Sequence, residues 1–283
     1  MKITQALAGR FRLETSGGER GYIDHGWSDN LILDTGIQKL LTSTAFSNNV
    51  CGYMSVGTAS NPVNTSQTSL LGRLATTSRA QKESFGYNEA ERFGWTRMSV
   101  QFDKGAAAGN ISELGAGWDS IGSLFSRAII LDSSGLPTAI TVLPDEFLTV
   151  TYELRRWWNG FQPTVISYFD EGVERVATVE SVDATDTSGR GLGAAPTNAF
   201  IKFEQSSSIT YEKAESGALF FSINFELTEG NPSIGTVTSS QSPLFTANII
   251  PYSAGFKFTP PIPKTNEFTV TIKCQVTFKR RGE

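Results

Sequence analysis

A strict alternation of apolar and polar side chains marks the C-terminal residues Val270-Thr271-Ile272-Lys273-Cys274-Gln275-Val276-Thr277-Phe278. Successive side chains of a β-strand point to opposite faces, so this period of two predicts a strand with one face in a core and Cys274 on that face. The earlier Phe256-Lys257-Phe258 predicts a short strand that stops at the prolines after it, because proline cannot donate to a sheet ladder. Together the two strands predict a hairpin at the end of a domain.

The same period of two recurs between residues 124 and 154. Its alternating members are Phe125, Arg127, Ile129, Leu131, Ile140, Val142, Leu148, Val150, Tyr152 and Leu154. The run Asp132-Ser133-Ser134-Gly135 interrupts this block with residue types that favour tight turns. We therefore expect consecutive antiparallel strands here.

One helix is predicted near the N-terminus. Asp34 or Thr35 can cap it, since both side chains accept hydrogen bonds from the first free backbone N–H groups of a helix. The residues that follow with the three- and four-residue spacing of an amphipathic helix are Ile37, Leu40, Leu41 and Thr44. This spacing predicts a helix of about three turns at most.

The rest of the chain favours strands and long loops. Its 283 residues include 30 Ser, 30 Thr and 27 Gly, a composition that suits strands and turns better than helices. We find no internal repeat and no interdomain linker. We predict an all-β fold, an antiparallel, jelly-roll-like β-sandwich with one short helix near the N-terminus and long loops. A single domain is expected over residues 1–283, with residues 159–250 as an insertion or an elaborated middle segment.

Charge and hydropathy exclude several classes of function. The net charge is −4 and the cations are scattered, so no basic surface is expected to neutralise phosphates and no nucleic-acid partner is predicted. Residues 1–9 are too short and interrupted for a signal peptide, and no apolar run approaches the length of a membrane span. We expect a soluble protein without membrane insertion.

Few residues have the spacing of a catalytic or cofactor site. Cys51 and Cys274 lie far apart in no Cys-x-x-Cys arrangement, so we predict two reduced structural thiols. His25 is the only histidine, and any mechanism based on histidine would have to use it. Residues 189–194, Gly-Arg-Gly-Leu-Gly-Ala, match a dinucleotide-binding string. The polar residues before it and the lack of a helix pattern after it predict a loop instead.

Paired carboxylates are the remaining candidates for acid-base chemistry, because a glycosidase needs only two. Asp145-Glu146 and Asp170-Glu171 are the nearest pairs, but each lies at a turn, and neighbouring residues of an extended chain point to opposite faces. We predict exposed turn residues. The loop around Asp183 lacks the remaining ligands of a calcium-binding loop. The sequence thus predicts no catalytic residue, no metal site and no cofactor.

The most unusual local run is Arg155-Arg156-Trp157-Trp158, where a predicted strand gives way to a loop. It could stack on a sugar ring or anchor a neighbouring subunit, because tryptophan and arginine dominate interface hot spots. Alternatively, alternate members close the end of the sandwich while one arginine reaches solvent. We take all four residues as candidate interface residues and expect at least one buried tryptophan.

Seven segments together carry a family resemblance: residues 27–36, 56–62, 67–70, 109–115, 124–128, 140–143 and 150–155. They resemble a group of tailed-bacteriophage virion proteins, usually described as tail, tail-fibre, neck or collar components. The resemblance covers residues 20–155, and more loosely those from Gly255 onward. It brings no catalytic motif and implies no active-site residue.

The resemblance implies a non-enzymatic structural subunit of a tailed-phage particle, placed in its neck, collar or tail apparatus. We expect it to be made in the bacterial host cytoplasm and to assemble as a symmetric homo-oligomer with other phage neck or tail proteins. Two alternatives stay open. One is a receptor- or carbohydrate-binding module of a tail fibre or baseplate, with host surface glycan as its partner, and the other is a glycan hydrolase.

Overall fold

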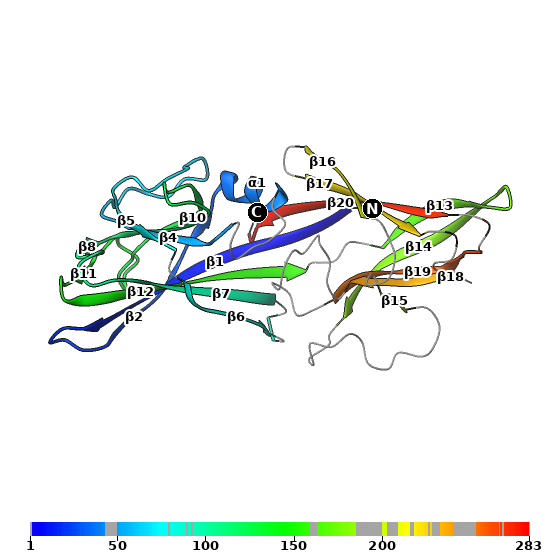
Figure 1. Cartoon of the computed structure of the whole chain (residues 1–283). Coiled ribbons are helices and arrows are strands. Elements are labelled where there is room, and N and C mark those ends of the chain that lie inside the picture. Colours follow the sequence, from blue (N-terminus) through cyan, green and yellow to red (C-terminus); the bar gives the residue numbers. More distant parts are fainter. Residues whose placement is uncertain are drawn as a thin grey trace. The chain divides into compact units, whose positions relative to one another are not determined.

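The structure is a computed structural model (Figure 1). It describes residues 2–42, 50–78, 80–88, 90–91, 93–158, 163–184, 200–202, 209–215, 218–225, 227, 233–239, 253–265, 267 and 269–282. Strands dominate these residues, their ladders are mostly antiparallel, and a nine-residue helix lies near the N-terminus. The predicted all-β class with one short helix is therefore confirmed. No helix within these ranges is long and apolar enough to cross a membrane.

By packing, the chain divides into two compact units. The N-terminal unit comprises residues 7–156 with 280–283, and the C-terminal unit comprises residues 1–6 with 157–279. All described residues of the segment 159–250, expected as an insertion, thus belong to the C-terminal unit. The division describes packing rather than independent folding, so the single domain over residues 1–283 stays a prediction.

The N-terminal unit contains two larger sheets and a two-stranded ribbon. The strands that belong to it wholly or for most of their residues are β1 (Lys2–Gly17), β2 (Ile23–Asp29), β3 (Leu31–Ile32), β4 (Tyr53–Gly57), β5 (Arg73–Thr77), β6 (Ala80–Asn88), β7 (Phe93–Phe102), β8 (Gly109–Ile111), β9 (Glu113–Gly117), β10 (Leu124–Ile129), β11 (Ile140–Val142) and β12 (Glu146–Trp158). In one sheet β1, β12, β7 and β6 are neighbours in that order, and β2 pairs with β1. The other has the order β3-β10-β9-β4-β5, and β11 pairs with β8.

Aromatic side chains join the two larger sheets of this unit. Tyr152 of β12 lies with its ring centroid 4.9 Å from that of Phe11 in β1 and 6.3 Å from that of Phe125 in β10. All three side chains are almost completely buried. A sheet with one buried face needs a second layer to cover it, and the Phe125–Tyr152 contact shows β10 supplying that layer.

The helix α1 (Asp34–Thr42) packs on β10. Thr35 donates from its Oγ1 to the carbonyl of Leu124 at 3.0 Å, and Leu40 is buried. At Gly36 a Cβ atom would overlap the carbonyl of Phe125, so only glycine permits this close approach. The predicted helix is confirmed in place and length, although Thr44 lies outside the described residues.

The C-terminal unit holds the remaining strands: β13 (Thr164–Asp170), β14 (Val173–Ala184), β15 (Phe200–Lys202), β16 (Ile209–Glu215), β17 (Ala218–Phe225), β18 (Ser233–Ser239), β19 (Ser253–Pro263) and β20 (Val270–Arg280). Five of them form a sheet of order β13-β14-β19-β18-β15, in which only the β15–β18 ladder is parallel. Separately, β17 pairs with both β16 and β20.

The predicted C-terminal hairpin is wrong, although both of its strands exist. Strand β19 pairs with β14 and β18, whereas β20 pairs with β17 in another sheet. Nor does β19 stop at Pro260, because it continues to Pro263. Pairing with β14 ends at Thr259, and pairing with β18 skips from Lys257 to Ile262. Pro260 and Pro261 therefore lie where β19 has no ladder partner, so their missing N–H groups break no ladder, whereas Pro263 pairs with Ser233 at the end of the strand.

The predicted consecutive pairing between residues 124 and 154 is also wrong. The turn itself forms, with Asp132 Oδ1 accepting from the backbone N–H of Ser134 at 2.8 Å. Beyond it the chain makes only an isolated bridge between Leu131 and Pro137, and then β11 pairs with β8. The backbone N–H of Ile130 donates to the carbonyl of Ser112, so the hairpin ladder does not extend, and β10, β11 and β12 belong to three sheets.

Candidate functional site

The candidates for proton chemistry are held in structural contacts. His25 lies in β2 and its Nε2 is 3.0 Å from Oγ1 of Thr15. Burial and the nearby charge of Arg20 lower the pKa of His25. No group of three or more His, Cys, Asp or Glu side chains that could hold a metal ion occurs in the part of the chain that the structure describes.

The carboxylate pairs do not form two-carboxylate sites. Asp145 is exposed as predicted, but Glu146 is 1% exposed, which corrects the prediction of an exposed turn residue. Its Oε1 accepts from Nε of Arg20 at 2.7 Å and its Oε2 from the N–H of Leu143 at 2.8 Å. The hydrogen bond from Arg20 holds the pKa of Glu146 below its usual value, so this carboxylate is a structural anion.

The second pair lies at a hairpin tip, where Asp170 ends β13 and Glu171 is an exposed turn residue. Residues 189–194, predicted as a loop, lie outside the described residues, as do the side chains of Cys274 and Asp183.

The run Arg155-Arg156-Trp157-Trp158 ends β12, and its members have different surroundings. Arg156 is 3% exposed and Trp157 8%, which confirms the expected buried tryptophan, whereas Arg155 has 21% of its side chain exposed. The side chain of Trp158 lies outside the described part. Only Arg155 is therefore placed by the structure at a surface.

Arg155 belongs to a cluster of three arginines around one buried carboxylate, that of Glu153. Glu153 Oε1 accepts from Nε of Arg10 and of Arg155, each at 2.7 Å, and Oε2 accepts from Nε of Arg97 at 2.5 Å. The arginines come from β1, β12 and β7, three neighbouring strands, because alternate residues of each strand face the same side of the sheet. Burial opposes the ionisation of Glu153, but these hydrogen bonds outweigh it and lower its pKa.

Aromatic rings extend this cluster across the sheet. The guanidinium of Arg10 lies 4.0 Å from the ring centroid of Trp27, and that of Arg97 lies 4.3 Å from Trp95 and 5.4 Å from Trp27. A Cβ atom at Gly86 would lie 2.5 Å from Cζ2 of Trp95, which is too close for any larger residue. The indole of Trp95 therefore packs against β6 only because residue 86 is glycine. Cations over indole faces are attracted by the ring quadrupole.

We call Arg10, Arg97, Arg155, Glu153, Trp27 and Trp95 the arginine–tryptophan face. The exposed fraction of the side chain is 24% for Arg10, 36% for Arg97 and 21% for Arg155. Three cations around one anion leave an excess of two positive charges, with donors still directed to solvent. This face can bind a group that combines negative charge with a flat apolar surface.

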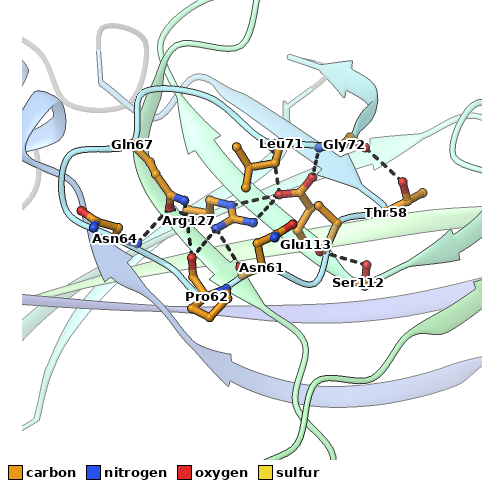
Figure 2. A network of polar contacts seen from close by, with 11 residues as sticks. Thr58, Asn61, Pro62, Asn64, Gln67, Leu71, Gly72, Ser112, Glu113 and Arg127 are labelled. Carbon is orange, nitrogen blue, oxygen red and sulfur yellow. Dashed lines mark hydrogen bonds and ion pairs between the residues drawn. The ribbon is translucent and has the colours of Figure 1, made fainter.

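A second polar network has a fully buried ion pair at its centre (Figure 2). Arg127 of β10 donates from Nε and Nη2 to Oε2 of Glu113 in β9, at 2.9 and 2.8 Å, and neither side chain is exposed. Arg127 Nη1 also donates to the carbonyl of Asn61 at 3.2 Å, and the carboxylate of Glu113 accepts from the N–H of Gly72 at 2.5 Å. The pair therefore anchors both ends of the segment 61–72.

Sequence reasoning missed both networks. It placed Arg127 in an alternating strand without a partner, and it gave no role to Arg10, Arg97 or Glu153. The available signal was a charged residue inside a strand whose neighbours are all apolar or small, since such a charge requires a partner when it is buried.

A further buried group, the thiol of Cys51, lies near Tyr152 and Arg156 of β12. Cys51 is completely buried as a free thiol, and burial raises its pKa well above the ordinary value. Burial lowers the pKa of Arg156 to about 10, and the nearby Cys51 and Tyr152 act in the opposite direction. A reduced, structural Cys51 is consistent with this setting.

Comparison of the chain with protein-family models, with curated proteins and with solved structures found no significant match.

Proposed function

We propose that this chain is a non-enzymatic structural subunit of a tailed-phage particle, in its neck, collar or tail apparatus. The observation that supports this role is the arginine–tryptophan face, which presents three partly exposed arginines and two indoles on one sheet. Tryptophan and arginine are the residue types that contribute most to protein–protein hot spots. The partner is a neighbouring virion protein or another copy of the chain that offers carboxylates and an apolar surface to this face.

The carboxylates support the non-enzymatic part of the proposal. Glu153 and Glu146 are each bound by arginine in a buried position, and their low pKa values suit structural anions rather than general acids. A glycosidase needs one carboxyl group with a raised pKa and a second across a gap that accommodates substrate.

A Trp27→Ala variant tests the proposal, because Trp27 contacts Arg10 and Arg97 without binding Glu153. Tyr22→Ala is the matched control, an aromatic residue 62% exposed on the same β1–β2 hairpin. We expect both variants to fold, and Trp27→Ala to be at least tenfold depleted from purified particles of the phage that encodes the chain. Normal incorporation of Trp27→Ala and full infectivity would contradict the assembly role of this face. Trp157→Ala is a poor test, because Trp157 is buried.

The carbohydrate-binding alternative rests on the same indoles, since an aromatic face can also stack on a sugar ring. It predicts that Trp27→Ala enters particles normally but loses binding to host surface polysaccharide.

Incubation of the purified chain with that polysaccharide tests the hydrolase alternative. Release of shorter glycans that stops in a Glu146→Gln or Asp170→Asn variant would overturn the non-enzymatic proposal.

A further inference from the structure

The β13–β14 hairpin leaves a row of apolar side chains in water. Val165 is 67% exposed, Phe169 74% and Val176 59%. The register pairs Val165 with Thr178, Ser167 with Val176 and Phe169 with Glu174, and paired residues of an antiparallel ladder share a face. On the opposite face Ala177 and Val179 are each 1% exposed. The hairpin therefore packs through one face and leaves the other, apolar one uncovered.

The same hairpin has an edge with which no strand of the described residues pairs, called its open edge below. Strand β13 is the end strand of its sheet (Figure 1). Glu171 and Gly172 form the two-residue turn, with φ of 50° and 78°, as a type I′ turn requires. Such a turn closes on a hydrogen-bonded pair, here Asp170 with Val173, so the even-numbered residues of β13 bond to β14. The backbone N–H and C=O groups of Val165, Ser167 and Phe169 then point to the open edge.

Apart from Asp170 at its end, β13 has no residue that protects this edge against pairing. Its sequence, Thr164-Val165-Ile166-Ser167-Tyr168-Phe169-Asp170, contains no lysine or proline, and its ladder with β14 has no register shift. Natural sheets commonly block an edge with a charge, a proline or a bulge, because an unprotected edge recruits another strand. An apolar, regular edge is therefore suited to a strand partner.

We propose that β13 pairs antiparallel with β13 of a second copy of this chain, around a two-fold axis at Ser167. Ser167 is the central residue of the seven-residue strand, so this register pairs every residue of β13. Val165 then lies opposite Phe169 of the partner subunit, and Ile166 lies opposite Tyr168 of the partner subunit. Apolar side chains meet apolar ones, and the small polar serine meets itself.

Charge selects the antiparallel orientation. Two parallel β13 strands in register would place their Asp170 carboxylates side by side, whereas antiparallel pairing sets each Asp170 opposite Thr164 of the partner subunit. The exposed Glu174 side chains would also lie at opposite ends of the joined sheet. Like charges directly opposite one another destabilise a strand pair, so only the antiparallel arrangement is free of this cost.

The size of the contact sets its expected strength. Stable interfaces bury about 800 Å² on each partner, and a single seven-residue strand pair buries less. We expect a concentration-dependent dimer with a Kd of about 1–100 μM. The contact is isologous, so it closes at two copies and can join two subunits of a larger assembly. The inference does not depend on the proposed virion role.

Sedimentation equilibrium of the purified full chain tests the pairing. We expect a monomer–dimer equilibrium that Phe169→Ser weakens at least tenfold. Val173→Ser is the control, because Val173 is 51% exposed on the same hairpin but lies on the other face, paired with Asp170, and neither substitution adds a charge to the ladder. A monomer at concentrations of several hundred micromolar, or a dimer equally weakened by both substitutions, would overturn the proposal.

Oxidative cross-linking tests the register. Ser167→Cys should form an intermolecular disulfide under mild oxidation, because the two-fold axis brings this position against its own copy. Glu174→Cys, exposed on the same face, should not cross-link, and the oxidised parent chain shows the background from Cys51 and Cys274. Cross-linking of Glu174→Cys without that of Ser167→Cys would overturn the register. These measurements use purified chain, so their outcome is separate from the particle experiments above.

Discussion

Arg127 and Glu113 form an ion pair in which both side chains have no exposed surface, with Nε and Nη2 of the arginine donating to the same carboxylate oxygen. The remaining donors and acceptors of the pair hold backbone groups of the segment 61–72 (Figure 2). Two charges removed from water are tolerated here because each is fully hydrogen-bonded. The pair therefore links the stability of the sheet to the conformation of this segment.

Glu113→Gln should destabilise the protein by about 3–5 kcal/mol, because it leaves the Arg127 cation buried without its anion. The free energy of unfolding in urea measures this loss. Glu174→Gln is the control, an exposed glutamate for which we expect a change below about 0.5 kcal/mol. A loss below about 1 kcal/mol in Glu113→Gln would show that solvent reaches Arg127.

The Glu153 cluster predicts a pH dependence of stability. The pKa of Glu153 lies below its ordinary value of 4.5 in the folded protein, so the unfolded chain binds a proton first as the pH falls. The stabilisation is complete above pH 4.5 and is lost as the pH falls through the folded-state pKa. Glu153→Gln should lower the free energy of unfolding by roughly 2 kcal/mol at pH 7.

The difference between the parent chain and Glu153→Gln should shrink progressively below pH 4.5, where the parent carboxylate also becomes neutral. Urea unfolding at several pH values from 7 to 3 measures it. A difference that stays constant over this range would mean that Glu153 contributes through shape rather than charge.

Cys51 should be unreactive in the native protein. The thiol is completely buried and its pKa is raised by that burial, so both access and thiolate formation are suppressed. In a Cys274→Ser background, labelling with a thiol reagent at pH 7.5 should be at least a hundredfold slower than in denaturant. Rapid native labelling would show that the N-terminal unit opens locally around Cys51.

Strand β20 allows a test of which of its residues lie on the core face. Its register with β17 pairs Ile272 with Ile223 and Lys273 with Ser222, and successive residues of a strand lie on opposite faces. The alternation in the sequence predicts that Ile272 is on the core face, so Ile272→Asp should abolish soluble protein, whereas Lys273→Asp should be tolerated. Yield and thermal midpoint are the measurements, and equal effects would show that both faces of β20 are covered.

The sequence alone determined features that depend on neighbouring residues. Alternation from Val270 to Phe278 predicts a strand because side chains of an extended chain alternate in direction, and that strand is present as β20. The sequence likewise predicted that a helix begins at Asp34, because the apolar spacing after it is a local pattern, although Thr35 donates to the carbonyl of Leu124 instead of capping the helix. The turn at Asp132 was predictable for the same local reason.

Only the tertiary structure decided which strands pair and which charges meet. Nothing near Phe258 shows that β19 joins β14, and nothing near Arg10 shows that its carboxylate partner is Glu153, 143 residues away. Alternation sets the face on which a side chain lies, but it does not determine the partner strand, because any strand with the same alternation can form the backbone hydrogen bonds. The partner is selected by the packing of the whole sheet, and with it the arginine–tryptophan face and the open edge of β13.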